Sequence, residues 1–493
     1  MHSPATQERK MTADPHIPEG CSRPPALTAA IRTEIHSIPW EDGAFIFYAP
    51  LRRTAWIGNA SVARVIERLR EPHAWAFTAK ETELVTFLKN VGILGGPPDV
   101  PPRAKFSSGF NFTRASLLLT TACTLRCRYC YAAAGDQLAK HMSLDTAIRG
   151  IDLIVSNAVQ LGAPGIELSF HGGGEPTVNW PVLTESVQYA QRRVREHGLT
   201  MQAYMATNAV LELSQVDWIG ANLSGLTVSL DGLPAVHDAN RCFRDGAPSS
   251  GRVLQTLRLL DERRFPYGVR ATVTAEAIAS LPDSVEYIFT MCHPASVQME
   301  PVYRFGRGQA AATAESEEFI SAFRLARQRA RSLGGELVFS PVRIGSLTDH
   351  FCEATKGSFC LSAGGNVTSC YEVFSEDRPW ASKFFFGKPA SDGGYTYDQS
   401  VLAELRSQSV QNRRHCRDCF VRWDCAGDCY HKALITNGDS EFQGTGRCHI
   451  IRELSKDMLL DRIASSGGVV WREGPPPGAT PSPGTELGDE KCV

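Results

Sequence analysis

Three closely spaced cysteines are the residues whose types and positions most clearly predict chemistry in this chain of 493 residues. They form the motif Cys123-x3-Cys127-x2-Cys130, directly after an apolar, strand-like run. Thiolates are soft ligands that suit iron–sulfur clusters or zinc. Three of them on one loop can hold three corners of a cubane cluster and leave one iron open, whereas a three-thiolate zinc site is the alternative. The spacing alone favours the cluster.

Polar groups also follow two later strand-like runs. His171 and the turn Gly172-Gly173-Gly174-Glu175 come directly after residues 165–170, and Asp231 and Arg241 follow a run that contains Ser229. Glycines let a ligand approach the backbone closely, and a glutamate offers a carboxylate to a cation. Functional groups of parallel α/β sheets gather beyond the carboxyl ends of the strands. We therefore expect these residues to meet the three cysteines at one mouth.

A second group of cysteines occupies the C-terminal third of the chain. A C-x2-C unit alone, such as Cys416 with Cys419, is typical of zinc. The complete group has eight members, which are Cys352, Cys360, Cys370, Cys416, Cys419, Cys425, Cys429 and Cys448. Of the 15 cysteines, the remaining four are interpreted as incidental thiols, and these are Cys21, Cys242, Cys292 and Cys492. Spaced cysteine clusters in a reducing compartment indicate metal or catalysis rather than disulfides.

The elements that must position these residues alternate between strands and helices over residues 113–335. Apolar runs predict strands at 115–121, 165–170, 201–206, 225–230, 267–274 and 297–302. Apolar residues three to four positions apart predict helices at 143–160, 181–197, 251–264, 281–291 and 315–333. This alternation predicts an α/β fold with a parallel sheet, either a barrel or a doubly wound sheet.

Four other segments flank this domain. Residues 1–35 and 472–493 are polar or rich in proline and glycine, which predicts disordered tails. Residues 36–100 combine short strand-like runs with two helical patterns. They predict a small α+β module that binds a partner, with a packing extension of the next domain as the alternative. Residues 340–465 show little periodicity, which predicts a domain organised by metal rather than by an apolar core.

Composition and charge exclude several classes of protein. The 51 basic and 53 acidic residues give a formal net charge of −2, which argues against a nucleic-acid-binding protein. No run of about 18 apolar residues occurs, so we expect no membrane span. The N-terminal residues lack the apolar core of a secretory signal, which predicts a cytoplasmic protein.

The three-cysteine motif, the turn 172–176 and the segment 229–241 together resemble the radical S-adenosylmethionine (SAM) superfamily. The resemblance implies a partial (β/α)6 TIM-like barrel over residues 113–335, in which Cys123, Cys127 and Cys130 ligate a [4Fe–4S] cluster whose open iron chelates SAM. It also implies a 5′-deoxyadenosyl radical that abstracts hydrogen from an unactivated carbon. The residues that it assigns to SAM binding are Tyr129, Gly172, Gly173, Gly174, Glu175, Asn208, Ser229, Asp231 and Arg241.

The eight C-terminal cysteines resemble the SPASM domain of peptide-modifying radical SAM enzymes, which holds two auxiliary [4Fe–4S] clusters. That resemblance implies one cluster on Cys352, Cys360, Cys370 and Cys429, and a second on Cys416, Cys419, Cys425 and Cys448. Residues 36–100 are similar in pattern and size to the RiPP recognition element, a winged-helix-like module whose sheet edge captures the leader of a precursor peptide. The expected partners are a ribosomally made precursor peptide and an external one-electron reductant of the flavodoxin or ferredoxin type, without nucleic acid or membrane.

The implied function is that of a peptide maturase, an oxidoreductase that installs a side-chain crosslink such as a cyclophane or another C–C or C–X macrocycle. With all eight auxiliary ligands present, no auxiliary iron is left open for a substrate thiolate. An anaerobic sulfatase-maturating enzyme is the alternative within the superfamily, but its aspartate base follows the cysteine that corresponds to Cys370, where this chain has Tyr371. Glu372 is then the candidate base, with a structural hydrogen-bond acceptor as its other interpretation. A non-catalytic iron–sulfur scaffold is the alternative from another class, and the intact three-cysteine motif argues against it.

Overall fold

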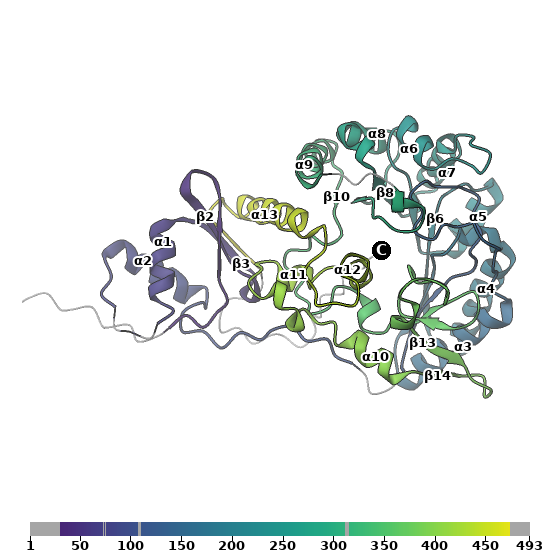
Figure 1. The fold of residues 1–493 in the computed structure, drawn as a ribbon, viewed down its shortest axis with the longest axis horizontal. Helices are drawn as coiled ribbons and strands as arrows, with labels where there is room; N and C mark the ends of the chain where they lie inside the picture. Colours follow the sequence, from purple (N-terminus) through teal and green to yellow (C-terminus); the bar gives the residue numbers. More distant parts are fainter. Residues whose placement is uncertain (1–29, 72, 74, 107–109, 311–314, 474–493) are drawn as a thin grey trace, which may run out of the picture.

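The computed structural model describes residues 30–71, 73, 75–106, 110–310 and 315–473. Most of the two expected tails, together with Cys21 and Cys492, lies outside these residues. Figure 1 shows an elongated molecule with a small module at one end and a large sheet clad in helices at the other. The C-terminal helices α11 (Arg422–Cys425), α12 (Tyr430–Asn437) and α13 (Cys448–Ser465) lie between these two parts.

A curved parallel sheet forms the larger part. Its strands pair in chain order: β4 (Arg114–Leu117), β5 (Gly165–Phe170), β6 (Thr200–Thr207), β7 (Gly225–Ser229), β8 (Tyr267–Val273), β9 (Val297–Pro301) and β10 (Leu337–Val338). The helices of this part are α3 (Leu144–Leu161), α4 (Trp180–Glu196), α5 (Leu213–Asn222), α6 (Pro234–Asn240), α7 (Ser250–Glu262), α8 (Leu281–Met291) and α9 (Ser316–Ser332). The predicted partial barrel is confirmed, whereas the short helices α5 and α6 were not predicted.

The sheet separates an apolar outer face from a polar lumen. In β8, Val269, Ala271 and Val273 are buried in the core that also contains the apolar side chains of the outer helices. Arg270 therefore projects from the opposite face, because side chains alternate along a strand. On β4 and β5 the hydroxyl oxygens of Ser116 and Ser169 meet at 2.6 Å. Closed barrels usually fill this space with branched apolar side chains.

The C-terminal region extends the same sheet beyond β4. Its strands are β11 (Cys360–Leu361), β12 (Val367–Thr368), β13 (Phe385–Pro389) and β14 (Tyr395–Tyr397), so the sheet has eleven strands and stays open. Its helices are α10 (Gln399–Arg406), α11 (Arg422–Cys425), α12 (Tyr430–Asn437) and α13 (Cys448–Ser465). Buried Phe359, Phe384 and Leu402 belong to the core of the barrel. The expectation of a region without an apolar core was wrong, because its apolar residues are spaced too irregularly to produce a periodic pattern.

The N-terminal module is a small antiparallel sheet with two helices. Its strands β1 (His36–Pro39), β2 (Ala44–Ala49) and β3 (Thr54–Asn59) are followed by α1 (Ala60–Arg68) and α2 (Ala79–Asn90). A fourth strand, β15 (Val470–Arg472), comes from the C-terminal end of the described chain and pairs with β3. Side chains of one face of the sheet share a core with α1 and α2. On the other face, the Tyr48 hydroxyl donates to Asp424 in α11 at 2.9 Å.

The first described residues belong to this module. Ile31 and Ile35 are buried in its core, and Ile31 forms a β-bridge with Leu94. The predicted boundary of disorder at residue 35 was therefore wrong, since these two isoleucines, four positions apart, provide apolar surface that the module buries.

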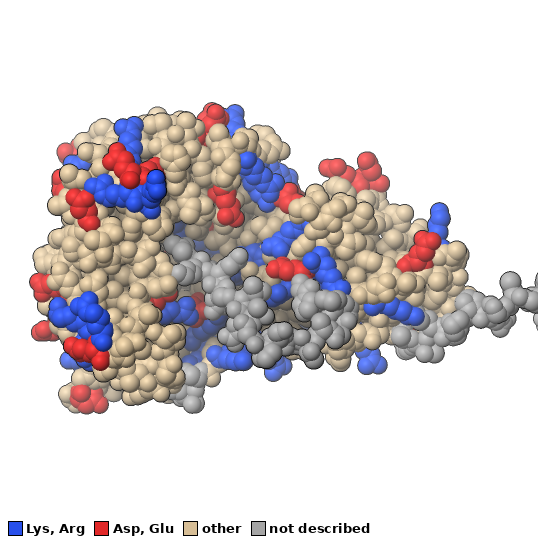
Figure 2. All heavy atoms as spheres, turned by 180° about the vertical axis from the view of Figure 1, so that it is seen from behind, with Lys and Arg blue, Asp and Glu red and all other residues tan. Residues whose placement is uncertain are grey.

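The surface charge and the apolar length of the helices can be examined for the described residues. On the face in Figure 2, acidic and basic side chains are interspersed. None of the described helices is long and apolar enough to cross a membrane.

Candidate functional site

The three-cysteine loop follows β4 and is held by backbone contacts from distant segments. The amide nitrogens of Arg126 and Arg128 each donate to a carbonyl of residues 240–242 at 2.9 Å. The Arg307 guanidinium donates to the Cys127 carbonyl oxygen, also at 2.9 Å. Cys127 is buried, whereas Cys123 and Cys130 are partly exposed. The loop is thus fixed from two sides.

The glycine turn after β5 packs directly on this loop. Glu175 donates its backbone N–H to the Ala122 carbonyl oxygen at 2.8 Å. A Cβ on Gly174 would lie only 2.0 Å from that oxygen, so only glycine fits there. Gly172 and Gly173 have positive φ angles of 55° and 73°, which glycine adopts without strain. The glycines predicted at this turn thus have a backbone role next to the cysteine loop.

Glu175 connects the ends of β5 and β6. Its buried carboxylate accepts hydrogen bonds from the Thr207 hydroxyl at 2.8 Å and the Asn208 amide N–H at 2.7 Å. Thr177 adds its hydroxyl at 3.0 Å and its N–H at 3.3 Å. Burial raises the pKa of Glu175 despite these donors. The carboxylate therefore braces the site within the chain, and its contact with SAM stays a prediction.

Asn208 links the hydrogen-bond network of Glu175 to the cysteine loop. Its side-chain amide donates to the Thr124 hydroxyl at 2.9 Å and lies 3.7 Å from the Cys123 sulfur. Sequence reasoning named Asn208 as a SAM contact but missed Thr207 and Thr124, because only the fold brings β6 next to the loop.

A second buried group lies beneath the loop. The Tyr129 hydroxyl donates to Asp231, and the Arg241 guanidinium donates to the same carboxylate at 3.0 Å. Thr272 adds its backbone N–H at 3.0 Å. The Arg241 guanidinium also lies 5.2 Å from the centre of the Tyr129 ring. The structure thus brings Tyr129 together with Asp231 and Arg241, from which it is separated by 102 and 112 positions in the sequence. The strand-end argument predicted that Asp231 and Arg241 would meet the cysteine loop.

His237, as a neutral imidazole, forms hydrogen bonds that stabilise the group Tyr129–Asp231–Arg241. Its Nδ1 accepts from the Asp231 backbone N–H at 3.3 Å, so Nε2 carries the proton and donates to the Ser249 hydroxyl at 3.0 Å. That hydroxyl in turn donates to the Arg241 carbonyl. Burial lowers the pKa of His237 to about 4, and the charge of Arg241 acts in the same direction.

The loop supplies three thiols, and thiolates are the ligands that iron–sulfur clusters take. Burial raises the pKa of Cys123 to about 12 and that of Cys127 to about 11. Metal binding must therefore displace protons from these thiols, as it does at other thiolate sites. Within the described part of the chain, no three His, Cys, Asp or Glu side chains meet closely enough to hold a single metal ion.

The lumen side of the site carries polar side chains from both parts of the sheet. The rings of His171 and Tyr371 are 3.9 Å apart, and the Arg270 guanidinium forms a hydrogen bond with Tyr371. Burial, together with the charge of Arg270, lowers the pKa of His171 to about 4. Ser229 ends β7 beside Arg270 on β8. Sequence reasoning missed Arg270, whose only signal was a charge within an apolar run.

Glu372 faces the same lumen but is already paired. Its carboxylate accepts a hydrogen bond from His431 Nδ1 at 2.8 Å. Burial acts to raise the pKa of Glu372, but this hydrogen bond and the charges of Lys432 and Arg270 hold it well below its usual range. A carboxylate with so low a pKa is a weak base, which favours the structural interpretation of Glu372 over the catalytic one.

The C-terminal cysteines fall into two neighbourhoods. Burial raises the pKa of Cys370, and Cys429 and Cys352 lie close enough to add to this effect. Cys448 acts in the same way on three other cysteines, namely Cys416, Cys419 and Cys425. These neighbourhoods divide seven of the eight cysteines, and the two ligand sets stay predictions. Cys360 is on β11 beside β4, where its thiol has hydrogen-bond partners in Ser358 and Ser116, and its ligand role stays a prediction.

A buried ion pair links the two neighbourhoods. Arg447 precedes Cys448 and binds Asp428, which precedes Cys429. The same guanidinium reaches Glu300 on β9 at 2.5 Å. Positive charge from Arg447 lowers the pKa of Asp428 to about 2 against the effect of burial. Both cysteine-bearing segments are thereby fixed to the barrel.

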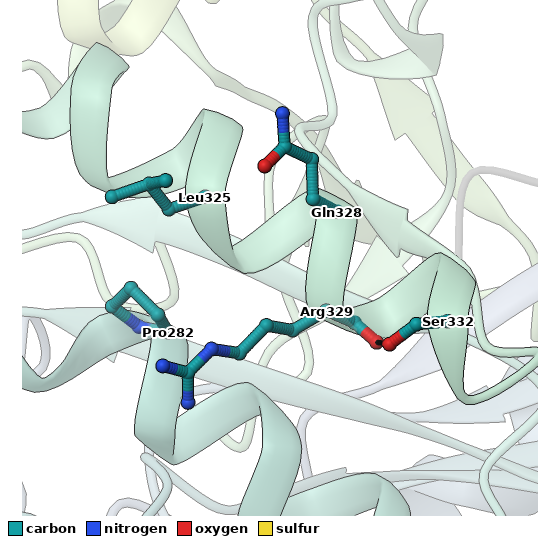
Figure 3. Close-up of a pocket in the computed structure, with 5 residues that line it drawn as sticks. All are labelled: Pro282, Leu325, Gln328, Arg329 and Ser332. Carbon is teal, nitrogen blue, oxygen red and sulfur yellow. Dashed lines mark hydrogen bonds between the residues drawn. The ribbon is translucent and has the colours of Figure 1, made fainter.

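Two of the remaining cysteines and a surface hollow are described by the structure. Cys292 is buried at the end of α8, as expected for a core thiol. The Cys242 carbonyl contacts the cysteine loop, whereas its thiol was interpreted as incidental. Figure 3 shows a surface hollow between α8 and α9, lined by Pro282, Leu325, Gln328, Arg329 and Ser332. It contains none of the predicted site residues.

Comparison with known proteins places this geometry in context. Residues 117–278 match the model of the radical SAM superfamily. The sporulation killing factor maturation protein SkfB of Bacillus subtilis (strain 168) is 24% identical over 269 residues, which cover 52% of this chain and 59% of SkfB. Alignments to the curated relatives span 38–59% of the lengths of those relatives.

Two solved structures share the fold. Native anSMEcpe with bound AdoMet and the Cp18Cys peptide is 16% identical with a TM-score of 0.58, over 72% of this chain and 99% of that one. Streptococcus suis SuiB bound to S-adenosylmethionine is 13% identical with a TM-score of 0.51, over 86% of this chain and 100% of SuiB.

Proposed function

Because residues 117–278 match the model of the radical SAM superfamily, we propose that the chain is a maturase that modifies a ribosomally made peptide by hydrogen abstraction. One observation carries the proposal. The cysteine loop, the glycine turn and the group Tyr129–Asp231–Arg241 meet at the carboxyl ends of adjacent strands, beside the polar side chains of the lumen. That arrangement supports a cluster site and a cofactor site at one end of the barrel.

Each residue has a defined task in this proposal. Cys123, Cys127 and Cys130 hold a [4Fe–4S] cluster, and Asn208 orients the loop by its contacts with Thr124 and Cys123. Gly172, Gly173 and Gly174 let SAM approach the backbone beside the cluster, while Glu175 braces the turn. When bound, SAM and the cluster supply a 5′-deoxyadenosyl radical. The proposed SAM contacts are Tyr129, Ser229, Asp231 and Arg241.

The C-terminal region is proposed to carry two auxiliary clusters that accept the electron released on oxidation of the substrate. The grouping of Cys352, Cys370 and Cys429, apart from Cys416, Cys419, Cys425 and Cys448, supports two sites, and Cys360 completes the first of them. An external one-electron reductant of the flavodoxin or ferredoxin type starts each turnover. The product is then a side-chain crosslink, such as a cyclophane.

A peptide substrate is supported by two observations. The N-terminal module has the strand and helix order expected of a leader-binding element. SkfB, which is similar over half of this chain, is a maturation protein for the sporulation killing factor. Sulfatase maturation is less well supported, because Tyr371 follows Cys370 and Glu372 is paired with His431.

The decisive experiment is anaerobic reconstitution followed by addition of SAM and dithionite. Formation of 5′-deoxyadenosine and about 12 iron atoms per chain, four for each of three clusters, are expected. A protein that binds zinc and makes no 5′-deoxyadenosine would instead be a scaffold. Co-expression with short open reading frames from the gene's neighbourhood should yield a peptide that has lost two hydrogens per crosslink.

Replacement of Cys127 by alanine tests the assigned cluster site. The C127A variant should lose all peptide modification, because two thiolates on the loop cannot replace a three-cornered ligand set. Mass spectrometry of the co-expressed peptide measures the outcome. The matched control is C292A, whose buried thiol belongs to the core at the end of α8 and should leave modification intact. Modification that persists in C127A would refute the site.

A further inference from the structure

The outer edge of β3 is occupied by a short strand from the other end of the chain. β15 runs antiparallel to β3, with Val470 opposite Trp56, Trp471 opposite Ala55 and Arg472 opposite Thr54. The pairing extends by one hydrogen bond at each end, from the Ile57 N–H to the Val469 carbonyl at 3.2 Å and from the Glu473 N–H to the Arg53 carbonyl at 3.0 Å. Five residues of the C-terminal segment thus lie along β3 as an added strand.

Trp471 is the most deeply buried side chain of this segment, and Glu473 adds an ion pair with Arg462 at 3.0 Å. Trp471 is 6% exposed and packs into the main core beneath the sheet, where the Arg462 guanidinium lies 4.8 Å from the centre of its ring. Val470 faces the opposite side and contacts the core under α1 and α2. Backbone pairing plus a single buried aromatic residue is the pattern by which extended peptides add to sheet edges.

Backbone hydrogen bonds rather than packed side chains hold the connection to α13, since the N–H groups of Ser466 and Gly468 donate to the Ile463 carbonyl at 3.1 and 2.9 Å. Residues 464–469 are all exposed. Gly467 and Gly468 have φ angles of 97° and 83°, and a Cβ on either would meet no atom within 4 Å. Val469 is 62% exposed. No packed side chain therefore fixes the path between α13 and β15.

The opposite edge of the sheet is poorly suited to take another strand. β1 has only four residues, and its last residue, Pro39, has no N–H to donate. Short edges that contain proline resist strand addition. Of the two edges, β3 therefore offers the longer and more complete row of backbone groups.

We propose that β15 is an intramolecular competitor, which occupies the β3 edge and must leave it before a peptide can pair there. An extended peptide that runs antiparallel to β3, with an aromatic side chain opposite Ala55 and a β-branched one opposite Trp56, exchanges with residues 469–473. This assignment rests on the proposed peptide substrate, whose leader would be the incoming strand. A tethered strand competes at an effective concentration on the order of millimolar, so release of β15 strengthens binding of a peptide added in solution.

Fluorescence anisotropy with a labelled peptide of residues 466–473 tests this exchange in the full-length protein, without SAM or reductant. Trp471→Ala weakens the resident strand, and this variant should bind the peptide at least tenfold more tightly than the wild-type protein. Val469→Ala is the matched control, because its exposed side chain anchors nothing, and it should bind as the wild type does. A peptide whose tryptophan is replaced by alanine should bind the W471A variant at least tenfold more weakly.

Equal binding of the peptide by wild type and a folded W471A variant would overturn the proposal. If W471A does not fold, hydrogen exchange in the wild-type protein decides the question. The Glu473 N–H, which donates to the Arg53 carbonyl, should exchange at least tenfold faster than the paired N–H groups of β2, and equal protection would overturn the proposal. Because 5′-deoxyadenosine formation is measured separately, failure here and failure of the proposed radical chemistry give different results.

Discussion

His237 should make the stability of the barrel depend on pH between 7 and 5. The side chain is fully buried and must stay neutral, since its Nδ1 accepts from the Asp231 N–H and its Nε2 donates to Ser249. Burial lowers its pKa from 6.5 to about 4. In the unfolded chain it gains a proton as the pH falls below 6.5, whereas in the folded chain it stays neutral until about pH 4. Stability is therefore full above pH 6.5 and lost towards pH 4.

The size of this effect follows from the shift. Each pKa unit is worth about 1.4 kcal/mol, so a shift of about 2.5 units gives a total of about 3 kcal/mol. About 2 kcal/mol of the free energy of unfolding should be lost between pH 7 and pH 5. His237→Gln removes the titrating group, so the difference in stability between wild type and variant should shrink by that amount over the same interval.

Urea denaturation of both proteins at pH 7, 6 and 5 measures this difference. At pH 7 the variant should be less stable by about 1–3 kcal/mol, because it loses buried hydrogen bonds. His197→Gln, at the exposed end of α4, is the control and should follow the wild type at every pH. A constant difference between H237Q and wild type from pH 7 to pH 5 would refute the reasoning.

Two further substitutions probe the packing of the site. Gly174→Ala places a Cβ 2.0 Å from the Ala122 carbonyl oxygen and should lower the iron content after reconstitution, whereas Gly251→Ala, whose Cβ meets open space, should not. Arg447→Met leaves two buried carboxylates without their cation and should cost about 3–5 kcal/mol in urea denaturation. Arg263→Met breaks a largely exposed ion pair and should cost less than about 1 kcal/mol, and equal losses in the two variants would contradict the assignment.

The strands of the barrel were predictable because their signal is local. Residues 165–170 were predicted as a strand with the observed bounds, since an apolar run between turn residues needs no distant partner to be recognised. The convergence of Asp231 and Arg241 with Tyr129 followed from the topology of parallel sheets. The contact of Asn208 with Cys123 did not, because it depends on how β6 twists beside the loop.

Pairings between distant segments of the chain were beyond sequence reasoning. β15 has three residues, too few for any periodic pattern, and its partner strand lies more than 400 positions earlier. The buried ion pair of Arg447 with Glu300 likewise joins residues that are 147 positions apart. Arg270 was missed for another reason. A charged residue inside an apolar run indicates a break in the strand, unless the face of the sheet that it projects from is known to be polar.

The pairing of β3 with β15 also has a consequence for the order of folding during synthesis. β1, β2 and β3 leave the ribosome early, but their fourth strand follows some 410 residues later. At about 5–20 residues per second, the β3 edge stays uncovered for roughly 20–80 s. During that interval the β3 edge can pair with any extended segment nearby. The nascent module can therefore bind a peptide before β15 has been synthesised.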